Sequence, residues 1–288
     1  MLTALTASVV TLLCTANGAA SRDLTFISDW GENPSGLEMR AYFPDPLPES
    51  PDVILALHAC SLSGIQYEEE NNYTVYADET GFIALFPSTL NQGNCWDVAN
   101  PDSLTCGSGG SGSAGLINMI QWSISEYNAD PARIFFTGSS SGCMMTNVMC
   151  GKYPDVFAAA SRYSGFPAGC LAGAAGSSPG TADPACALGE ARSSEEWAQA
   201  VWGMYPGYNG TYPRTMIWHG TADEMVLYPN LAETLKQWST VFDVPFTKNV
   251  TDDPYPGYTK MLYGDGTQLL GYSAEGVGHM SLQMWNRS

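Results

Sequence analysis

One short segment of the chain has the residue pattern of an activated serine. Residues 138–142 read Gly-Ser-Ser-Ser-Gly, directly after an apolar run at 133–137 and before a helical pattern. A Gly-x-Ser-x-Gly turn between a strand and a helix lifts the serine hydroxyl above the edge of a sheet. The glycines are needed because neighbouring backbone would crowd a Cβ at either position. We therefore predict that Ser140 is a nucleophile and that the segment is more than a Gly/Ser-rich loop.

A serine hydroxyl needs a histidine as general base, and the histidine needs a carboxylate that orients it. The chain contains three histidines. In the chain order serine, acid, histidine, only His279 has an acid candidate on a strand-end loop between itself and Ser140. That acid is Asp223, in the loop after the apolar run 214–218. The predicted triad is Ser140, Asp223 and His279.

The remaining candidates are weaker. Asp252 and Asp253 also precede His279, but they follow no clear buried strand. His219 comes just before the loop of Asp223, and we expect it to be a structural histidine that holds this loop. His58 ends an early apolar strand, at the place where an oxyanion loop belongs.

The negative charge that develops on a carbonyl oxygen during ester cleavage requires two backbone N–H donors. One is the amide of Ser141, which follows the nucleophile at the start of a helix. The second should come from the loop after the run 52–57, and we assign it to the amide of Cys60. Ala59 and Ser61 are alternatives for this second donor.

The cysteine at 95 precedes a tryptophan in the sequence Asn-Cys-Trp-Asp. Cys95 is a natural disulfide partner for Cys60, and such a bridge would pin the oxyanion loop. It would also place Trp96 beside the cleft, where its indole could contact substrate. The alternative is that Trp96 is an ordinary core residue.

Strand and helix patterns alternate along the chain. Short apolar runs at 52–57, 82–86, 133–137, 157–163 and 214–218 are typical of strands buried on both faces. Helical patterns lie at 65–80, 113–128, 142–153, 194–204 and 229–242, and further strands are expected at 257–263 and 267–272. Residues 23–28 and 38–43 suggest an antiparallel edge hairpin. The alternation predicts an α/β protein with a mainly parallel sheet and helices on both faces.

Composition excludes several classes of partner. The chain has 288 residues, with 11 Lys and Arg against 29 Asp and Glu, so its formal net charge is −18. A protein this acidic is repelled by nucleic acid and by anionic membranes. No Cys-x-x-Cys pair occurs, and three histidines make a zinc cluster improbable. We expect no metal, no cofactor, and a monomer.

The N-terminus has the pattern of a secretory signal. Residues 2–13 are apolar and uncharged and are followed by small residues up to Ala20. A buried N-terminal helix is the alternative. Four Asn-x-Ser/Thr sequons also fit an exported chain; they are Asn72, Asn209, Asn249 and Asn286. We therefore expect a signal peptide over 1–20 and a single secreted, extracellular domain over 21–288.

Eight cysteines are present, of which Cys14 falls in the predicted signal. The remaining seven are an odd number, so at least one thiol is free or pairs outside the chain. Cys170 and Cys186 bracket a Gly/Ala/Ser/Pro-rich loop that a disulfide would hold. Cys143 and Cys150 lie two helical turns apart, about 10 Å, which is too far to bridge.

Several longer motifs together resemble one known family. They are LHAC near residue 57, NCWDV at 94–98, TGSSSGCMMTNVM at 137–149, YSGFPAGC at 163–170, MYPGY at 204–208, IWHGTADEMVLYPNLAETLKQW at 217–238 and EGVGH at 275–279. They are similar to the fungal secreted esterases of carbohydrate esterase family 1. That group contains acetylxylan esterases and type B feruloyl esterases, with a wider kinship to polyhydroxybutyrate depolymerases. The resemblance covers about residues 24–280.

The resemblance implies an α/β-hydrolase fold and agrees with the triad assigned above. It also implies disulfides between Cys60 and Cys95 and between Cys170 and Cys186. Three cysteines are then left without an assignment: Cys106, Cys143 and Cys150.

The chain departs from the family pattern at three places. Where the family usually reads LTHNGGGDS, this chain reads LTCGSGGSGS, so that Cys106 and Gly112 replace a histidine and an aspartate. Cys143 replaces a small residue after the second glycine of the turn. The segment MSLQMWNRS follows His279 in place of an aromatic-rich tail. None of these changes affects the triad.

The sequence thus predicts a secreted serine esterase that deacylates plant cell-wall xylan, with acetate as the preferred acyl group. The loop 105–115 offers no aromatic face for a ferulate ring, which favours acetate. A feruloyl esterase with the same triad is the alternative within this class. A catalytically idle relative that only binds carbohydrate is the alternative from a different class.

Overall fold

The structure of the protein is a computed structural model that describes residues 23–108, 111–175 and 184–279. The predicted signal peptide over 1–20 lies outside these residues, as does sequon Asn286. Within the described residues no helix is long and apolar enough to cross a bilayer.

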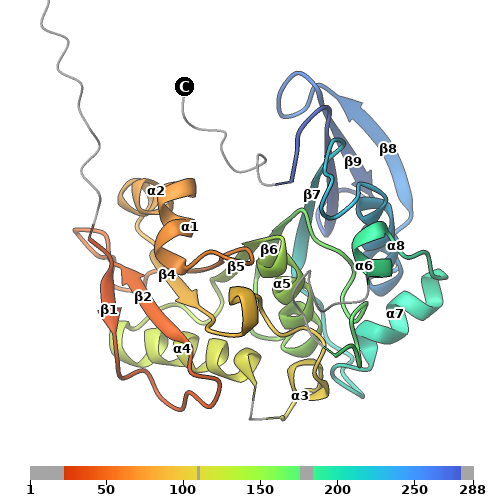
Figure 1. Ribbon diagram of the computed structural model, residues 1–288. Helices are drawn as coiled ribbons and strands as arrows, with labels where there is room; N and C mark the ends of the chain where they lie inside the picture. Colours follow the sequence, from red (N-terminus) through yellow and green to blue (C-terminus); the bar gives the residue numbers. More distant parts are fainter. Residues whose placement is uncertain (1–22, 109–110, 176–183, 280–288) are drawn as a thin grey trace, which may run out of the picture.

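Ten strands of the described chain form one sheet in the order β1-β2-β4-β3-β5-β6-β7-β10-β9-β8 (Figure 1). Its central strands β4, β3, β5, β6, β7 and β10 pair in parallel. Their bounds are β3 Val53–Leu57, β4 Ile83–Ser88, β5 Ile134–Ser139, β6 Ala159–Tyr163, β7 Arg214–Gly220 and β10 Leu269–Ala274. Strands β3 to β7 match the five apolar runs of the sequence, and β10 matches the further strand expected at 267–272.

The edges of the sheet are antiparallel. Strands β1 (Thr25–Ile27) and β2 (Glu38–Tyr42) form the expected hairpin, and β2 pairs antiparallel with β4. At the other edge β9 (Tyr258–Tyr263) pairs with β10 and with β8 (Phe246–Thr251). Sequence reasoning missed β8, because nearly all its residues are exposed and it therefore has no apolar periodicity.

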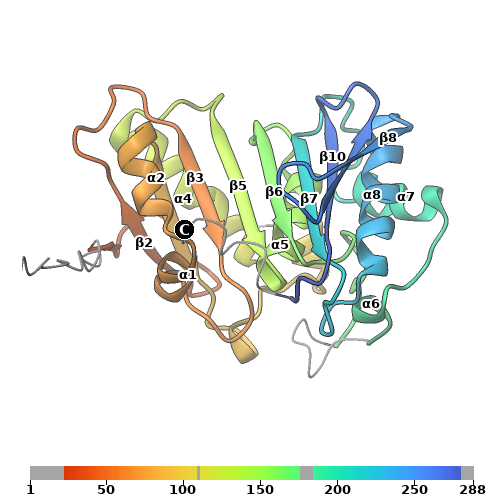
Figure 2. The same ribbon diagram turned by 90° about the horizontal axis from the view of Figure 1, so that it is seen from above.

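Helices cover both faces of the sheet, as predicted, but unequally. Side chains of α4 (Gly112–Tyr127), α5 (Ser141–Lys152), α7 (Ser194–Trp202) and α8 (Pro229–Phe242) belong to the main core. A second, smaller core lies under α1 (Gly64–Asn71) and α2 (Tyr73–Thr80). Figure 2 shows the strands side by side with α1 and α2 at one end of the sheet and α7 and α8 at the other.

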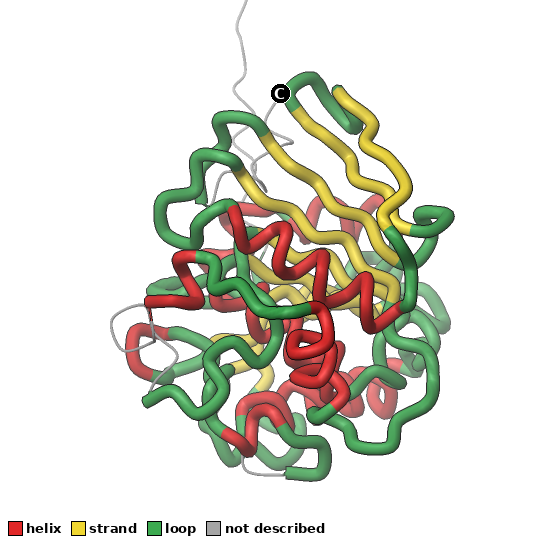
Figure 3. Tube along the Cα trace, turned by 90° about the vertical axis from the view of Figure 1, so that its right-hand side faces the viewer, coloured by secondary structure: helices red, strands yellow, loops and turns green. Residues whose placement is uncertain are grey.

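Successive side chains of the buried strands point alternately into these two cores. In β4 the side chains of Ile83 and Leu85 enter the main core, whereas those of Ala84 and Phe86 enter the smaller one. Side chains of successive strand residues point to opposite faces, so a strand covered on both sides must be apolar throughout. The twisted sheet with its packed helices is visible from the side in Figure 3.

One helical prediction is wrong, and three short helices were not foreseen. The expected single helix over 65–80 is two helices, because Asn72 adopts a left-handed conformation with φ of 56° between α1 and α2. Short helices at α3 (Pro101–Leu104), α6 (Pro184–Leu188) and η1 (Gln92–Asn94) were not predicted. The capping box at the start of α7 is present, with Ser193 and Glu196 hydrogen-bonding each other's backbone.

The parallel pairing decides where the candidate site residues lie. Parallel strands all end at one edge of the sheet, so the segments that follow β3, β5, β7 and β10 meet there. These segments contain His58, Ser140, Asp223 and His279. We call this edge the catalytic edge.

Candidate active site

Ser140 sits in the sharp turn between β5 and α5. Its φ of 52° and ψ of −118° are strained for a residue with a side chain. Its amide donates to the carbonyl of Tyr163 on β6 at 2.9 Å, and its carbonyl accepts from the amide of Met144 at 3.0 Å. The backbone of the turn is thereby held, while the side chain of Ser140 is 6% exposed at the catalytic edge.

The two glycines of the turn are required by close backbone approach. A Cβ on Gly138 would lie 2.5 Å from the carbonyl of Gly142. One on Gly142 would lie 2.2 Å from the carbonyl oxygen of Leu57 and 2.8 Å from that of His58. The start of α5 therefore packs directly on the end of β3, as the motif predicts.

The structure brings the predicted acid and base together. Nδ1 of His279 donates to Oδ2 of Asp223 at 2.7 Å. Nε2 of His279 is buried and has no hydrogen-bond partner among the described residues. Ser140 Oγ and His279 Nε2 are thus not hydrogen-bonded here, and they would have to approach when substrate binds.

Three hydrogen-bond donors and the ring of His219 surround the carboxylate of Asp223. Oδ1 accepts from the amides of Met225 at 3.0 Å and Val226 at 2.9 Å, and Oδ2 lies 3.2 Å from Nε2 of His219. Burial by itself raises the pKa of this carboxyl, but the hydrogen bonds from His219 and His279 outweigh it and hold the pKa well below its usual range. Asp223 therefore carries a fixed negative charge beside the imidazole of His279.

His219 holds the loop of Asp223, as expected from its place in the sequence. Its ring is buried, and Nε2 donates to the carbonyl of Val226 at 2.7 Å. The rival acids lie elsewhere, in the turn between β8 and β9. There Asp252 accepts from the amide of Gly257, and Asp253 lies 3.5 Å from Lys260.

The loop that carries His279 packs against the end of β7. A Cβ on Gly220 would lie 2.1 Å from the carbonyl oxygen of Val277, and the amide of Ala222 donates to the same oxygen at 3.0 Å. Gly276 donates to Oγ1 of Thr221 at 2.9 Å. Sequence reasoning assigned no role to Gly220, although its position between His219 and the acid loop was a signal for close approach.

The loop after β3 is tied down at several points. Cys60 forms a disulfide with Cys95, as the resemblance implied. The amide of Ser61 donates to the carbonyl of Gly93 at 2.7 Å, so this alternative oxyanion donor is already occupied. Within the described residues no backbone acceptor is present for the amides of Cys60 and Ser141. Cys60, with Ala59 as its remaining alternative, stays the predicted second donor.

The prediction that Trp96 contacts substrate is wrong. Its side chain is 1% exposed and its indole Nε1 donates to the carbonyl of His58 at 2.9 Å. Its backbone amide donates to Oγ of Ser141 at 2.8 Å. Trp96 is therefore a core residue that links the oxyanion loop to the residue after the nucleophile. Sequence reasoning missed this link because both contacts join segments distant in the chain.

His58 is neutral and structural. Its ring is fully buried, Nδ1 donates to the carbonyl of Ala59 at 2.7 Å, and Nε2 accepts from the amide of Thr89 at 3.2 Å. Burial lowers the pKa of His58 to about 4, against the opposing effect of the hydrogen bond to Ala59. The imidazole thus bridges the ends of β3 and β4 without carrying charge.

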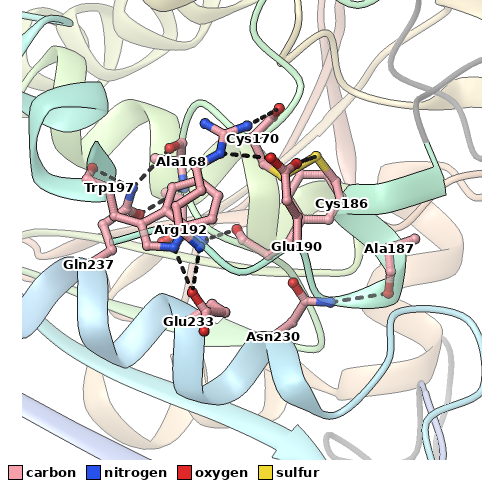
Figure 4. Close-up of a disulfide and its surroundings, with 12 residues drawn as sticks. Ala168, Cys170, Cys186, Ala187, Glu190, Arg192, Trp197, Asn230, Glu233 and Gln237 are labelled. Atoms are coloured by element: carbon pink, nitrogen blue, oxygen red, sulfur yellow. Dashed lines mark hydrogen bonds and ion pairs between the residues drawn. A yellow bond between two sulfur atoms is a disulfide. The ribbon is translucent and has the colours of Figure 1, made fainter. Parts of the chain in front are cut away.

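The second implied disulfide, Cys170–Cys186, is also present, beside α7 and α8 (Figure 4). Glu190 lies near both sulfurs and forms an ion pair with Arg192 at 2.9 Å. The guanidinium of Arg192 lies 4.4 Å from the ring of Trp197. The bridge therefore holds the segment before α7 against the helical layer of the main core.

The other three cysteines of the described segments, Cys106, Cys143 and Cys150, are free thiols. The side chain of Cys143 is accommodated because Gly165 faces it: a Cβ there would lie 2.4 Å from Sγ of Cys143. In the described parts of the chain, one group of three side chains meets the spacing of a metal site, namely Cys170, Cys186 and Glu190. Its two sulfurs are joined in a disulfide and supply no thiolate, so it offers no metal centre.

A family model described as "Esterase PHB depolymerase" matches residues 41–233. The chain is 45% identical over 257 residues to "Feruloyl esterase B" of Talaromyces stipitatus, covering 89% of this chain and 72% of that protein. It is 38% identical over 286 residues to "Acetylxylan esterase A" of Aspergillus awamori, covering 97% of this chain and 93% of that protein.

A solved structure shares both sequence and fold with the chain. The acetyl xylan esterase from Aspergillus awamori superimposes with a TM-score of 0.83 at 38% identity, over 90% of this chain and 94% of that one. A mainly parallel sheet flanked by helices, in an esterase of this similarity, is the α/β-hydrolase fold that the sequence predicted.

Proposed function

This chain belongs to the esterase PHB depolymerase family and is a carboxylic ester hydrolase, and from that premise we propose that Ser140, His279 and Asp223 cleave acyl esters on xylan. The observation that carries the triad is the His279–Asp223 hydrogen bond of 2.7 Å. It leaves Nε2 of the same ring without a partner among the described residues, at the catalytic edge where Ser140 lies.

In the proposed reaction Ser140 Oγ attacks the ester carbonyl while Nε2 of His279 takes its proton. Asp223, ionised throughout, stabilises the imidazolium that forms. The amides of Cys60 and Ser141 donate to the oxyanion. His279 then returns the proton to the departing sugar hydroxyl, and water releases the acyl group from Ser140 by the same steps in reverse order.

We place acetate first among the acyl groups. A planar ferulate ring needs apolar walls on both sides, whereas an acetyl group needs none. The segment 105–108 and 111–115 is built from small and polar residues apart from the free Cys106. Trp96, the aromatic residue that sequence reasoning had put beside the cleft, is buried in the core. Support for an aromatic slot is therefore weaker than the sequence alone suggested.

Feruloyl esters are the second candidate. The relatives named feruloyl esterase B are 43–45% identical to this chain, against 38–39% for those named acetylxylan esterase A. We expect kcat/KM for acetyl esters to exceed that for methyl ferulate by at least about tenfold, or about 1.4 kcal/mol in barrier. Equal rates, or a preference for methyl ferulate, would reassign the acyl group while leaving the triad in place.

Hydrolysis of p-nitrophenyl acetate tests the proposal most simply. A folded sample should release p-nitrophenol, and a serine-directed phosphonate should stop the release by labelling Ser140. Absence of turnover would favour a catalytically idle relative that only binds carbohydrate.

We further propose that residues 1–20 are a signal peptide and that 21–288 is the secreted domain. Two disulfides support an oxidising compartment, because cytosolic thiols are kept reduced. Acylated xylan is an extracellular polymer, so export would bring the enzyme to it. N-terminal sequencing of protein from the culture medium should begin at or near Ser21.

A further inference from the structure

A groove lies on the flank of the molecule, between residues 29–32 and the outer surface of α4. Its volume is about 700 Å³, within the range of sites for small molecules. None of the triad residues lines it. Figure 1 shows the hairpin β1–β2 and α4 at the same side of the molecule.

The walls of the groove are held in place. Nδ2 of Asn118 on α4 donates to the carbonyl of Glu32 at 2.6 Å. The side chain of Asn33 bonds the backbone of Leu37 in both directions, at 2.7 and 2.8 Å. Trp30 is buried beneath the loop, and Gly31 turns the chain with φ of 105°. The groove is therefore preformed.

One wall of the groove is an aromatic ring with a defined orientation. Trp122 is half-buried, and it packs against Phe43 and Tyr127 at centroid distances of 6.4 and 5.2 Å. These neighbours hold the indole while part of it lines the groove. A fixed, partly exposed indole can pack against the apolar face of a sugar ring.

The polar side chains of the groove suit hydroxyl groups. Gln121 and Asn118 present amides, and Asp29, Glu32 and Glu126 present carboxylates. Amides both donate and accept, and carboxylates accept, so together they can bind neutral hydroxyls. None of the described residues that line the groove is basic, so a phosphate or a uronic acid would meet uncompensated negative charge.

A bound cation is a poorer explanation of these carboxylates. Calcium needs six to eight oxygen ligands at about 2.3–2.6 Å around one point. A cation site needs at least three ligand atoms close together. Among the described residues, no three ligand atoms of the groove's acids lie within 4.8 Å of one another. The described part of the groove therefore holds no cluster of three acids that a single cation could use.

The groove reaches toward the catalytic edge. Glu38, the first residue of β2, pairs with Ser88, the last residue of β4. The loop 28–37 therefore lies at the same edge of the sheet as Ser140. Strands β4 and β3 separate β2 from β5, the strand that precedes Ser140. A polymer in the groove could extend to the triad.

We propose that this groove is a second carbohydrate-binding site, which takes an unsubstituted stretch of a neutral polysaccharide chain such as xylan. The proposal rests on the proposed function for the choice of xylan. Trp122 packs on a pyranose ring, and Gln121 and the carboxylates bind its hydroxyls. The site holds the polymer while the triad cleaves an ester elsewhere on it.

The test compares binding with intrinsic catalysis. Binding of xylohexaose, which has no ester, is measured by titration calorimetry, and kcat/KM is measured with p-nitrophenyl acetate. Trp122→Ala should weaken the binding at least about tenfold and Gln121→Ala about threefold. Both variants should keep kcat/KM within about twofold of the wild type. Release of acetate from insoluble acetylated xylan should fall in both variants.

Controls make the result decisive. Phe246→Ala removes an exposed ring from β8, at the opposite end of the sheet, and should bind xylohexaose like the wild type. Polygalacturonate, which is anionic, should not bind. Because Trp122 packs on its neighbours, Gln121→Ala serves as the variant that leaves the core intact.

The proposal would be overturned by the following pair of results. Gln121→Ala binds xylohexaose as tightly as the wild type, and Trp122→Ala binds it more weakly but also has a lower thermal midpoint, so that its loss reflects unfolding. Equal binding of polygalacturonate would overturn the ligand class. Absent turnover of p-nitrophenyl acetate by the wild type would contradict the proposed function alone, because binding of xylohexaose does not need Ser140.

Discussion

The two halves of the proposed triad are positioned by different means. Ser140 makes no side-chain hydrogen bond among the described residues; its place is dictated by a strained backbone and by the approach of α5 to β3. Asp223 and His279 are instead held by hydrogen bonds that converge on one carboxylate. We call these the serine arm and the acid–histidine arm.

The difference shows what each arm tolerates. The serine arm depends on excluded volume, so it should fail when an atom is added to its backbone contacts. The acid–histidine arm depends on a buried charge that accepts three hydrogen bonds, so it should fail when the charge or an acceptor is lost. The predictions below separate these two modes of failure.

Ser140→Ala should have the largest effect, a loss of about 10⁴-fold or more in kcat/KM for p-nitrophenyl acetate, because it removes the proposed nucleophile. The thermal midpoint should change little, since the side chain fills no core volume. Residual activity above about a thousandth of the wild type would rule out this residue as the nucleophile.

Asp223→Asn should lower kcat/KM by about a thousandfold. Oδ1 accepts from two backbone amides and Oδ2 accepts from His279, so the NH₂ of an asparagine would face a donor in either orientation and His279 would lose its alignment. The control is Asp253→Asn, at the exposed rival acid, which should keep nearly full activity. A similar loss in both variants would contradict the assignment.

Gly142→Ala should cost at least about 3 kcal/mol of unfolding free energy, because its Cβ would meet the carbonyls of Leu57 and His58. The matched control is Gly112→Ala at the start of α4, where the new Cβ would have ordinary contacts at 3.8 Å and beyond. That variant should be neutral or slightly more stable. Urea unfolding of both variants measures the difference, and equal midpoints would refute the volume argument.

Acid should affect His58, which follows the strand β3 on which the serine arm packs, and Asp223 of the acid–histidine arm in different pH windows. The folded pKa of His58 is about 4 against an ordinary value of 6.5, so this histidine stabilises the fold fully above pH 6.5 and progressively less down to pH 4. The lowering of the His58 pKa from 6.5 to about 4 corresponds to about 3 kcal/mol of unfolding free energy. The pKa of Asp223 is lowered from 3.8, so its contribution is lost below about pH 4.

Unfolding free energies measured between pH 7 and pH 3 test this separation. His58→Gln should flatten the curve between pH 6.5 and 4 and leave the fall below pH 4 unchanged. An unaltered slope above pH 4 in this variant would show that His58 is not the group that titrates in this window.

Most of the parallel sheet was predictable because strands such as β3, β4 and β5 are buried on both faces and therefore consist largely of apolar residues. The same reasoning failed for β8, whose exposed side chains leave no periodic pattern. It also failed at Asn72, where one residue in the left-handed conformation divides a helical pattern into α1 and α2. In both cases the pairing partner or the backbone conformation, and not the local hydropathy, decides the element.

The sequence by itself determined the serine turn, since its geometry follows from steric limits on a few adjacent residues. It also placed the acid and the base on strand ends, because parallel strands share one edge. Only the tertiary structure decided that Trp96 is a buried link and not a substrate wall. Only the tertiary structure assembled the groove, whose two sides come from residues 29–32 and 118–126. Such features depend on contacts between distant segments, and no local pattern encodes the direction in which a side chain finally packs.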